Sequence, residues 1–155
     1  MDTLLKSDDF LNARYRILRQ LGHGGFGRAY LAEDRNRFNE RCVFKEFAPQ
    51  LRGSSALEKA QELFEREAGV LYRLQHPQIP KFRELFRYKH EDKSRLLLVQ
   101  DYVEGETYHT LCHKRLKAGR KFSEAEIIRL LCQLLPVLAY IHSMGVIHQI
   151  GRASC

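Results

Sequence analysis

Apolar and polar residues alternate along several short stretches of the chain, and this period of two predicts β-strands. Glycines, Pro49 and a charged turn at residues 90–95 separate the stretches. The glycine cluster at residues 22–27 joins the first two stretches and predicts a hairpin. The predicted strands cover residues 15–21, 28–34, 42–47, 82–88 and 96–103.

One helix is predicted between these strands. Ser55 is followed three residues later by Glu58, a spacing that predicts a capping box at the start of a helix. Apolar side chains then recur with the helical period to about Leu74, where the sequence HPQIP ends the helix. The first part of the chain is therefore predicted to be a sheet with one inserted helix.

Beyond Gly105 the pattern becomes helical. A polar helix is predicted over residues 107–117, and a long apolar helix follows Ser123, which forms a second capping box with Glu126. This change of character places a boundary near residues 104–106. The whole chain is therefore predicted to have an α+β fold.

Length and composition limit the classes of protein to consider. The 155 residues are 44% hydrophobic and 10% aromatic, which is enough for a folded core and excludes wholesale disorder. The opening MDTLLKSDDFLN lacks the basic and then apolar pattern of a secretory signal, and no uninterrupted apolar run approaches the length of a membrane span. We therefore expect no membrane partner.

Charge and cysteine content indicate a cytoplasmic protein without a nucleic-acid partner. The formal net charge is +7, and the densest basic patch, residues 114–121, has no interleaved aromatic residues for base stacking. The cysteines form no CxxC pair, as expected of free thiols in a reducing compartment. They are Cys42, Cys112, Cys132 and Cys155.

The glycine cluster suggests contact with phosphate. Gly22, Gly24 and Gly27 fit GxGxxG, a weak pattern in which glycines let backbone N–H groups approach phosphate oxygens. A dinucleotide-binding fold would need a helix directly after Gly27, but the sequence RAYLA before the next polar stretch is too short for one. The hairpin is therefore either a phosphate-binding lid or a glycine-rich turn without a ligand.

Lys45 and Glu67 form a second candidate constellation. Lys45 lies in the apolar strand CVFKEF, and Glu67 lies in the apolar stripe of the inserted helix. A carboxylate in such a stripe is costly unless it meets a cation. We expect Glu67 to pair with Lys45; the alternative is that Glu67 lies at the edge of the stripe and reaches water.

Four motifs occur together in order: GHGGFGRAY, CVFK, FEREAGVLYRLQHPQI and LLLVQDYVEGETY. Over about residues 15–148 the chain resembles the N-terminal lobe, and the start of the C-terminal lobe, of bacterial eukaryotic-like protein serine/threonine kinases. The resemblance implies a five-stranded antiparallel N-lobe sheet with one helix and a partial helical C-lobe. The implied division is an N-terminal extension at 1–14, the N-lobe at 15–104, the C-lobe stub at 105–148 and an aberrant tail at 149–155.

The resemblance also implies ATP-dependent phosphorylation of protein serine or threonine, with ATP and Mg²⁺ as cofactors. Lys45 would orient the phosphates, and Glu67 would be its ion-pair partner. The implied ATP-binding residues are Leu21, Gly22, Gly24, Gly25, Phe26, Gly27, Ala29, Val43, Lys45, Gln100, Asp101, Val103 and Thr107.

Several of these residues have separate implied roles. Gln100 would be the gatekeeper, and the backbone of Asp101 and Val103 would bond the adenine edge. Thr107 would contact the ribose. The adenine ring would be covered by apolar side chains, those of Leu21, Ala29 and Val43.

The resemblance ends near the catalytic loop. His148 fills the histidine position of HRDxxxxN, but Gln149 stands at the arginine position and Ile150 at that of the catalytic base. The magnesium-holding residues of the family have no counterpart. We therefore expect a truncated, inactive chain; the alternative is a non-enzymatic nucleotide-binding or regulatory fragment.

Two further expectations concern the helical part. His109, Cys112 and His113 lack a fourth ligand, so no zinc site is predicted. The helix at 124–144 is apolar around most of its circumference, so we expect self-association through it where nothing else covers it.

Overall fold

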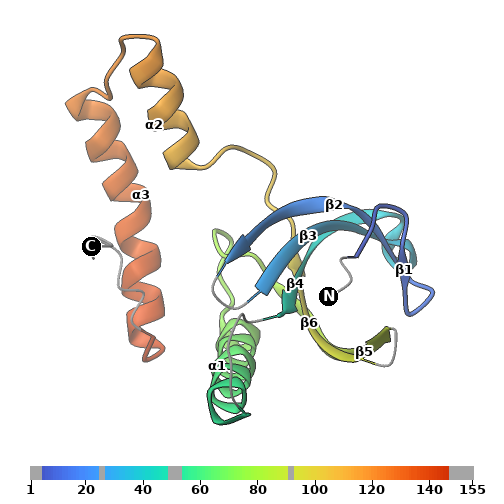
Figure 1. Cartoon of the computed structure of the whole chain (residues 1–155). Helices are drawn as coiled ribbons and strands as arrows, with labels where there is room; N and C mark the ends of the chain where they lie inside the picture. The colour runs from blue at the N-terminus through green and yellow to red at the C-terminus, as the bar shows by residue number, and fades with distance from the viewer. Residues whose placement is uncertain (1–4, 25–26, 49–53, 91–92, 147–155) are drawn as a thin grey trace. The chain divides into compact units, whose positions relative to one another are not determined.

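The computed structural model describes residues 5–24, 27–48, 54–90 and 93–146. The chain divides into two compact units, Met1–Tyr102 and Val103–Cys155. The first contains a β-sheet and helix α1, and the second contains helices α2 and α3 (Figure 1).

The sheet has strand order β1-β2-β3-β4-β6-β5, and every neighbouring pair is antiparallel. Its strands are β1 (Phe10–Leu11), β2 (Tyr15–Gly24), β3 (Gly27–Asp34), β4 (Glu40–Phe47), β5 (Phe82–His90) and β6 (Lys93–Asp101). The five predicted strands are all present, but β6 runs from Lys93 to Asp101, so the predicted strand end at Val103 is wrong. The two-residue strand β1 is added at the edge. A short 3₁₀ turn, η1 (Arg35–Arg37), connects β3 to β4.

An aromatic cluster fills one face of the sheet. The ring of Tyr15 meets that of Phe44 edge-on with centroids 4.8 Å apart, and it stacks on Phe86 at 6.1 Å. Leu5 and Leu11 are buried in the same cluster. The residues that precede β2 therefore contribute to the core, which their short, irregular pattern does not predict.

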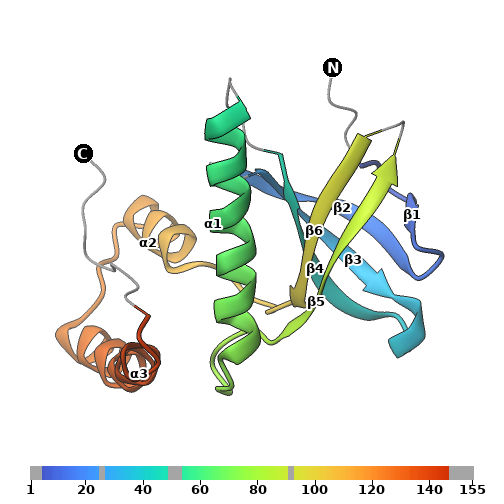
Figure 2. The same cartoon turned by 90° about the horizontal axis from the view of Figure 1, so that it is seen from below.

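Helix α1 (Ser54–Arg73) covers the other face of the sheet (Figure 2). Phe64 and Ala68 pack there against Leu96 and Leu98 of β6. Because the helix includes both Ser54 and Ser55, Ser55 is not the cap, and the predicted start of the helix is wrong at this point. The predicted end agrees with the structure to within a residue.

In the second unit, α2 (Tyr108–Lys117) and α3 (Glu124–Ser143) form a helical pair. The predicted capping box at the start of α3 is confirmed, because Ser123 and Glu126 bond each other's backbone N–H groups. Arg115 of α2 donates to Glu126 at 2.9 Å and lies over the ring of Phe122. These contacts fix the turn between the two helices.

Helix α3 exposes a broad apolar surface. Ile141 is buried, whereas four large apolar side chains in the first and middle turns of the helix are about half exposed. By length and composition this helix could cross a membrane, although a core helix of a soluble domain meets the same test. The exposed apolar residues are Ile127, Ile128, Leu131 and Leu135.

Candidate functional site

The hairpin of β2 and β3 carries the glycine cluster. At Gly27 the backbone φ is +149°, and a Cβ atom would lie 1.8 Å from the carbonyl oxygen of Glu46 and 2.6 Å from the amide nitrogen of Ala48. No side chain fits in that space, so glycine is required for the close approach of β3 to the end of β4. Of the predicted loop residues, Gly25 and Phe26 lie outside the described residues.

A cavity of about 400 Å³ lies under this hairpin, wholly within the first unit. Strand β4 and helix α1 supply the side opposite the hairpin. Six of the predicted site residues line it: Leu21, Gly22, Gly27, Ala29, Lys45 and Glu67.

Lys45 and Glu67 form the predicted ion pair in this cavity, with 3.0 Å between Nζ and Oε1. Lys45 lies opposite Ala29 in the β3–β4 ladder, and Glu67 lies on α1 one turn after the buried Phe64. The side chains are 35% and 42% exposed, so water reaches both charges. The ammonium group is therefore held in place but remains available to a ligand.

Sequence reasoning did not identify His23, Arg28, Glu46 and Phe64, which also line the cavity. His23 and Arg28 lie within the motif GHGGFGRAY at positions that its glycine pattern leaves open, and Glu46 directly follows the motif CVFK. Phe64 lies on the apolar face of α1, and this position predicts that it packs in the core but does not indicate that it also lines a cavity.

Glu46 is almost fully buried and is surrounded by donors. It accepts a hydrogen bond from Tyr30 at 3.1 Å and forms ion pairs with Arg28 at 3.4 Å and with Arg95. Burial, followed by the charge of Glu46, raises the pKa of the Tyr30 hydroxyl to about 12. Tyr30 is therefore a neutral donor that helps to hold the carboxylate behind the cavity.

Several of the predicted adenine-binding residues do not line this cavity. Gln100 pairs with Val43 in the β4–β6 ladder, and neither lines the cavity. The backbone N–H of Asp101 donates to the carbonyl of Lys81 at 2.9 Å. An adenine contact at Asp101 would therefore use its carbonyl oxygen.

Val103 and Thr107 belong to the second unit. Val103 is 66% exposed. The hydroxyl of Thr107 caps α2 by accepting a hydrogen bond from the backbone N–H of Thr110 at 3.1 Å. This hydroxyl therefore caps a helix, a structural role in addition to the predicted contact with ribose.

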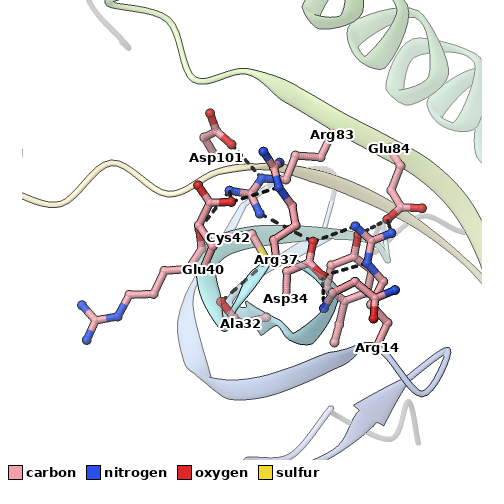
Figure 3. A network of polar contacts seen from close by, with 12 residues as sticks. Arg14, Ala32, Asp34, Arg37, Glu40, Cys42, Arg83, Glu84 and Asp101 are labelled. Atoms are coloured by element: carbon pink, nitrogen blue, oxygen red, sulfur yellow. Dashed lines mark hydrogen bonds and ion pairs between the residues drawn. The ribbon is translucent and has the colours of Figure 1, made fainter.

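A polar network holds the end of the sheet from which Asp101 leads out of β6 (Figure 3). The side chain of Arg83 is 5% exposed and bonds Asp101 at 2.7 Å and Glu40 at 2.9 Å. Arg14 binds the fully buried Asp34 through two hydrogen bonds of 2.7 Å. The four strands β3, β4, β5 and β6 and the β1–β2 turn are therefore joined at this end by charged groups.

The same network sets the protonation of Asp34. Burial alone would raise the pKa of this carboxyl, but the hydrogen bonds and charge of Arg14 outweigh it and lower the pKa below its usual value. Asp34 is therefore an anion that also accepts from the backbone N–H of Asn36 at 3.1 Å.

The described residues suit a nucleotide phosphate better than a metal. Backbone N–H groups of a glycine hairpin and a lysine ammonium are suitable partners for phosphate oxygens. Within the described part of the chain no three His, Cys, Asp or Glu side chains gather as metal ligands. Gln149 and Ile150, with the rest of the tail, lie outside the described residues.

Comparisons with known proteins agree with this geometry. A family model for the protein kinase domain matches residues 15–149. The serine/threonine-protein kinase-like protein E of Synechocystis sp. is 40% identical over 145 residues, and serine/threonine-protein kinase B of the same organism is 41% identical over 141 residues. These matches cover 93% and 90% of this chain but 22% and 23% of those proteins. The chain thus spans less than a quarter of their length.

A solved structure shows the same fold. The kinase domain of PknI from Mycobacterium tuberculosis, crystallised as a double mutant, superposes with a TM-score of 0.72 at 24% sequence identity. The match covers 94% of this chain and 55% of that domain.

Proposed function

Because this chain belongs to the protein kinase family, we propose that it binds ATP under the β2–β3 hairpin, in a site built for phosphorylating serine or threonine of proteins. The observation that supports the proposal most strongly is the meeting of Gly27, Lys45 and Glu67 at one cavity. Glycine is required there by the close approach of two strands, and the cation is held by a partner on a different element.

We place the protein in the cytoplasm, in line with the free thiols of the described Cys42, Cys112 and Cys132.

Each residue has a physical role in this proposal. Lys45 places its ammonium against phosphate oxygens, and Glu67 fixes the direction of the lysine side chain. The N–H groups of the glycine hairpin bond the phosphates from above. Gly24, Gly25 and Phe26 are proposed as further ATP-binding residues of the glycine loop.

The adenine ring would lie toward the end of β6. Leu21, Ala29 and Val43 supply its apolar cover. The carbonyl of Asp101 and the N–H of Val103 would bond its edge, next to Gln100 as gatekeeper. Thr107 is proposed for the ribose.

The 155-residue polypeptide itself is proposed to bind ATP without transferring phosphate. A kinase needs a base at the position that Ile150 occupies, and an aliphatic side chain cannot accept the proton of a hydroxyl. This favours the second candidate function, a nucleotide-binding or regulatory fragment. A phosphotransfer assay on generic protein substrates should show no activity that depends on Lys45.

The binding proposal is tested by titrating ATP while recording backbone amide spectra. Because the family's magnesium-holding residues have no counterpart in this sequence, we expect a dissociation constant no tighter than about 1 mM. Amides of Gly22, Gly27 and Lys45 should shift, and Lys45→Met should remove the shifts. Lys59→Met is the matched control, because Lys59 pairs with Glu62 on the exposed side of α1.

Two outcomes would contradict the binding proposal. One is an absence of shifts at the hairpin, and the other is equal shifts in Lys45→Met and in the unsubstituted chain. A micromolar dissociation constant would instead show that groups beyond those described contribute to the site.

A further inference from the structure

Two histidines on α2 form a ligand pair that the proposed nucleotide site does not use. His109 and His113 lie one helical turn apart, and their ring centroids are 4.6 Å apart at an interplanar angle of 64°. Both are exposed. Across the described part of the chain, the only interaction of either ring is with the other.

The ring spacing agrees with that of two imidazoles on one metal ion. A metal–nitrogen bond of about 2.0–2.1 Å puts each ring centroid about 3.2 Å from the ion. Two such bonds at about 90–110° to each other hold the centroids about 4.5–5.2 Å apart. The observed 4.6 Å lies in this range, so the spacing of the two rings matches that of two ligands on one ion.

Two of the three basic residues near the histidines are paired with carboxylates. Lys114 and Arg115 follow His113 in the sequence, and each is already paired with a carboxylate. Their partners are Glu106 and Glu126 respectively. These two charges are thus partly neutralised, and Lys117, one turn beyond His113 on the same face, is the positive charge that remains near the pair.

We propose that His109 and His113 form a two-imidazole site for a borderline divalent cation such as Ni²⁺, Cu²⁺ or Zn²⁺, with water in the remaining positions. Imidazole nitrogen suits these ions, whereas Mg²⁺ prefers oxygen ligands. The proposed site has two protein ligands and is open to water. It differs from a closed structural zinc site, which needs four protein ligands. The bound ion joins two turns of α2 and therefore stabilises this helix by mass action.

Calorimetric titration of the full chain with Ni²⁺ tests the proposal. We expect one principal site, weakened at least about tenfold by His109→Ala or His113→Ala, because the second bond is then no longer intramolecular. The double variant Tyr108→His/His109→Ala keeps the number of histidines but spaces the pair by five residues, and it should be weakened equally. His142→Ala, on the last turn of α3, should bind as the unsubstituted chain does.

Thermal unfolding gives an independent readout. Saturating Ni²⁺ should raise the melting temperature of the helical signal in the unsubstituted chain and not in His113→Ala, while Mg²⁺ should have no such effect. Unchanged affinity in the five-residue variant would overturn the proposal. So would loss of binding in Cys112→Ser, because the thiol would then be the principal ligand.

Discussion

Gly27 has the least freedom of any described glycine. Its hypothetical Cβ overlaps backbone atoms of β4, which cannot rotate away as a side chain can. At Gly22, by contrast, an added Cβ would meet nothing within 4 Å. Packing against β4 therefore requires glycine at position 27 but not at position 22.

This difference gives a prediction for stability. Gly27→Ala should lower the free energy of unfolding by about 2–3 kcal/mol, because the strands must separate to admit the methyl group. Gly22→Ala should cost less than about 1 kcal/mol. Urea denaturation of both variants measures the contrast, and equal losses would show that β3 does not approach β4 as described.

The Lys45–Glu67 pair is a contact between two partly solvated charges. We expect a coupling of about 1 kcal/mol or less, because water screens ion pairs that are more than a third exposed. A double-mutant cycle on Lys45→Ala and Glu67→Ala, followed by urea denaturation, measures this coupling. A value above about 2 kcal/mol would mean that the pair is buried in solution.

At the scale of elements, the capping box of α3 makes the second unit sensitive to acid. The hydrogen bond from Arg115, followed by that from the backbone N–H of Ser123, lowers the pKa of Glu126 from 4.5 to about 2. A carboxyl whose pKa is lower in the folded state contributes stability above its unfolded pKa and loses it as the pH falls.

Helix stability in the second unit should therefore decrease between about pH 4.5 and pH 2, as Glu126 is protonated. Glu126→Gln should reduce this dependence. Glu124→Gln, in the same first turn but outside the box, should keep it. Circular dichroism across the pH range distinguishes the variants, and identical profiles would exclude the role assigned to Glu126.

The sequence predicts those elements that have a clear period. The end of α1 and the ion pair between β4 and α1 follow from helical spacing, because this period fixes which side chains share a face. The β2–β3 hairpin follows from its glycine cluster. The strand β1 has only two residues and therefore no period. The bonds of Arg83 to Asp101 and Glu40 join residues far apart in the chain, and no local pattern indicates them.

At the scale of the whole molecule, the apolar surface of α3 departs from an ordinary soluble surface. Ile128 and Leu135 are 51% and 56% exposed. Each large aliphatic side chain left in water forgoes about 1.5–3 kcal/mol of burial energy. We expect the 155-residue chain to self-associate through this surface.

Light scattering over a range of concentrations tests this expectation. The apparent mass should rise with concentration, and Ile128→Glu with Leu135→Glu should suppress the rise without loss of helical signal. Phe38→Glu is a control, because Phe38 is fully exposed in the first unit. A monomer at every concentration would contradict the prediction.

The central claim is that Lys45 meets the phosphates of ATP in the cavity under the β2–β3 hairpin. An ATP analogue with an acyl group on its terminal phosphate tests it most directly, because a lysine amine beside the phosphates attacks the acyl carbonyl, forms an amide and releases the nucleotide. Peptide mass spectrometry then identifies the labelled lysine. We predict that Lys45 carries most of the label and that excess ATP suppresses the labelling. Label spread over surface residues such as Lys59 and Lys81, unaffected by ATP, would contradict the account.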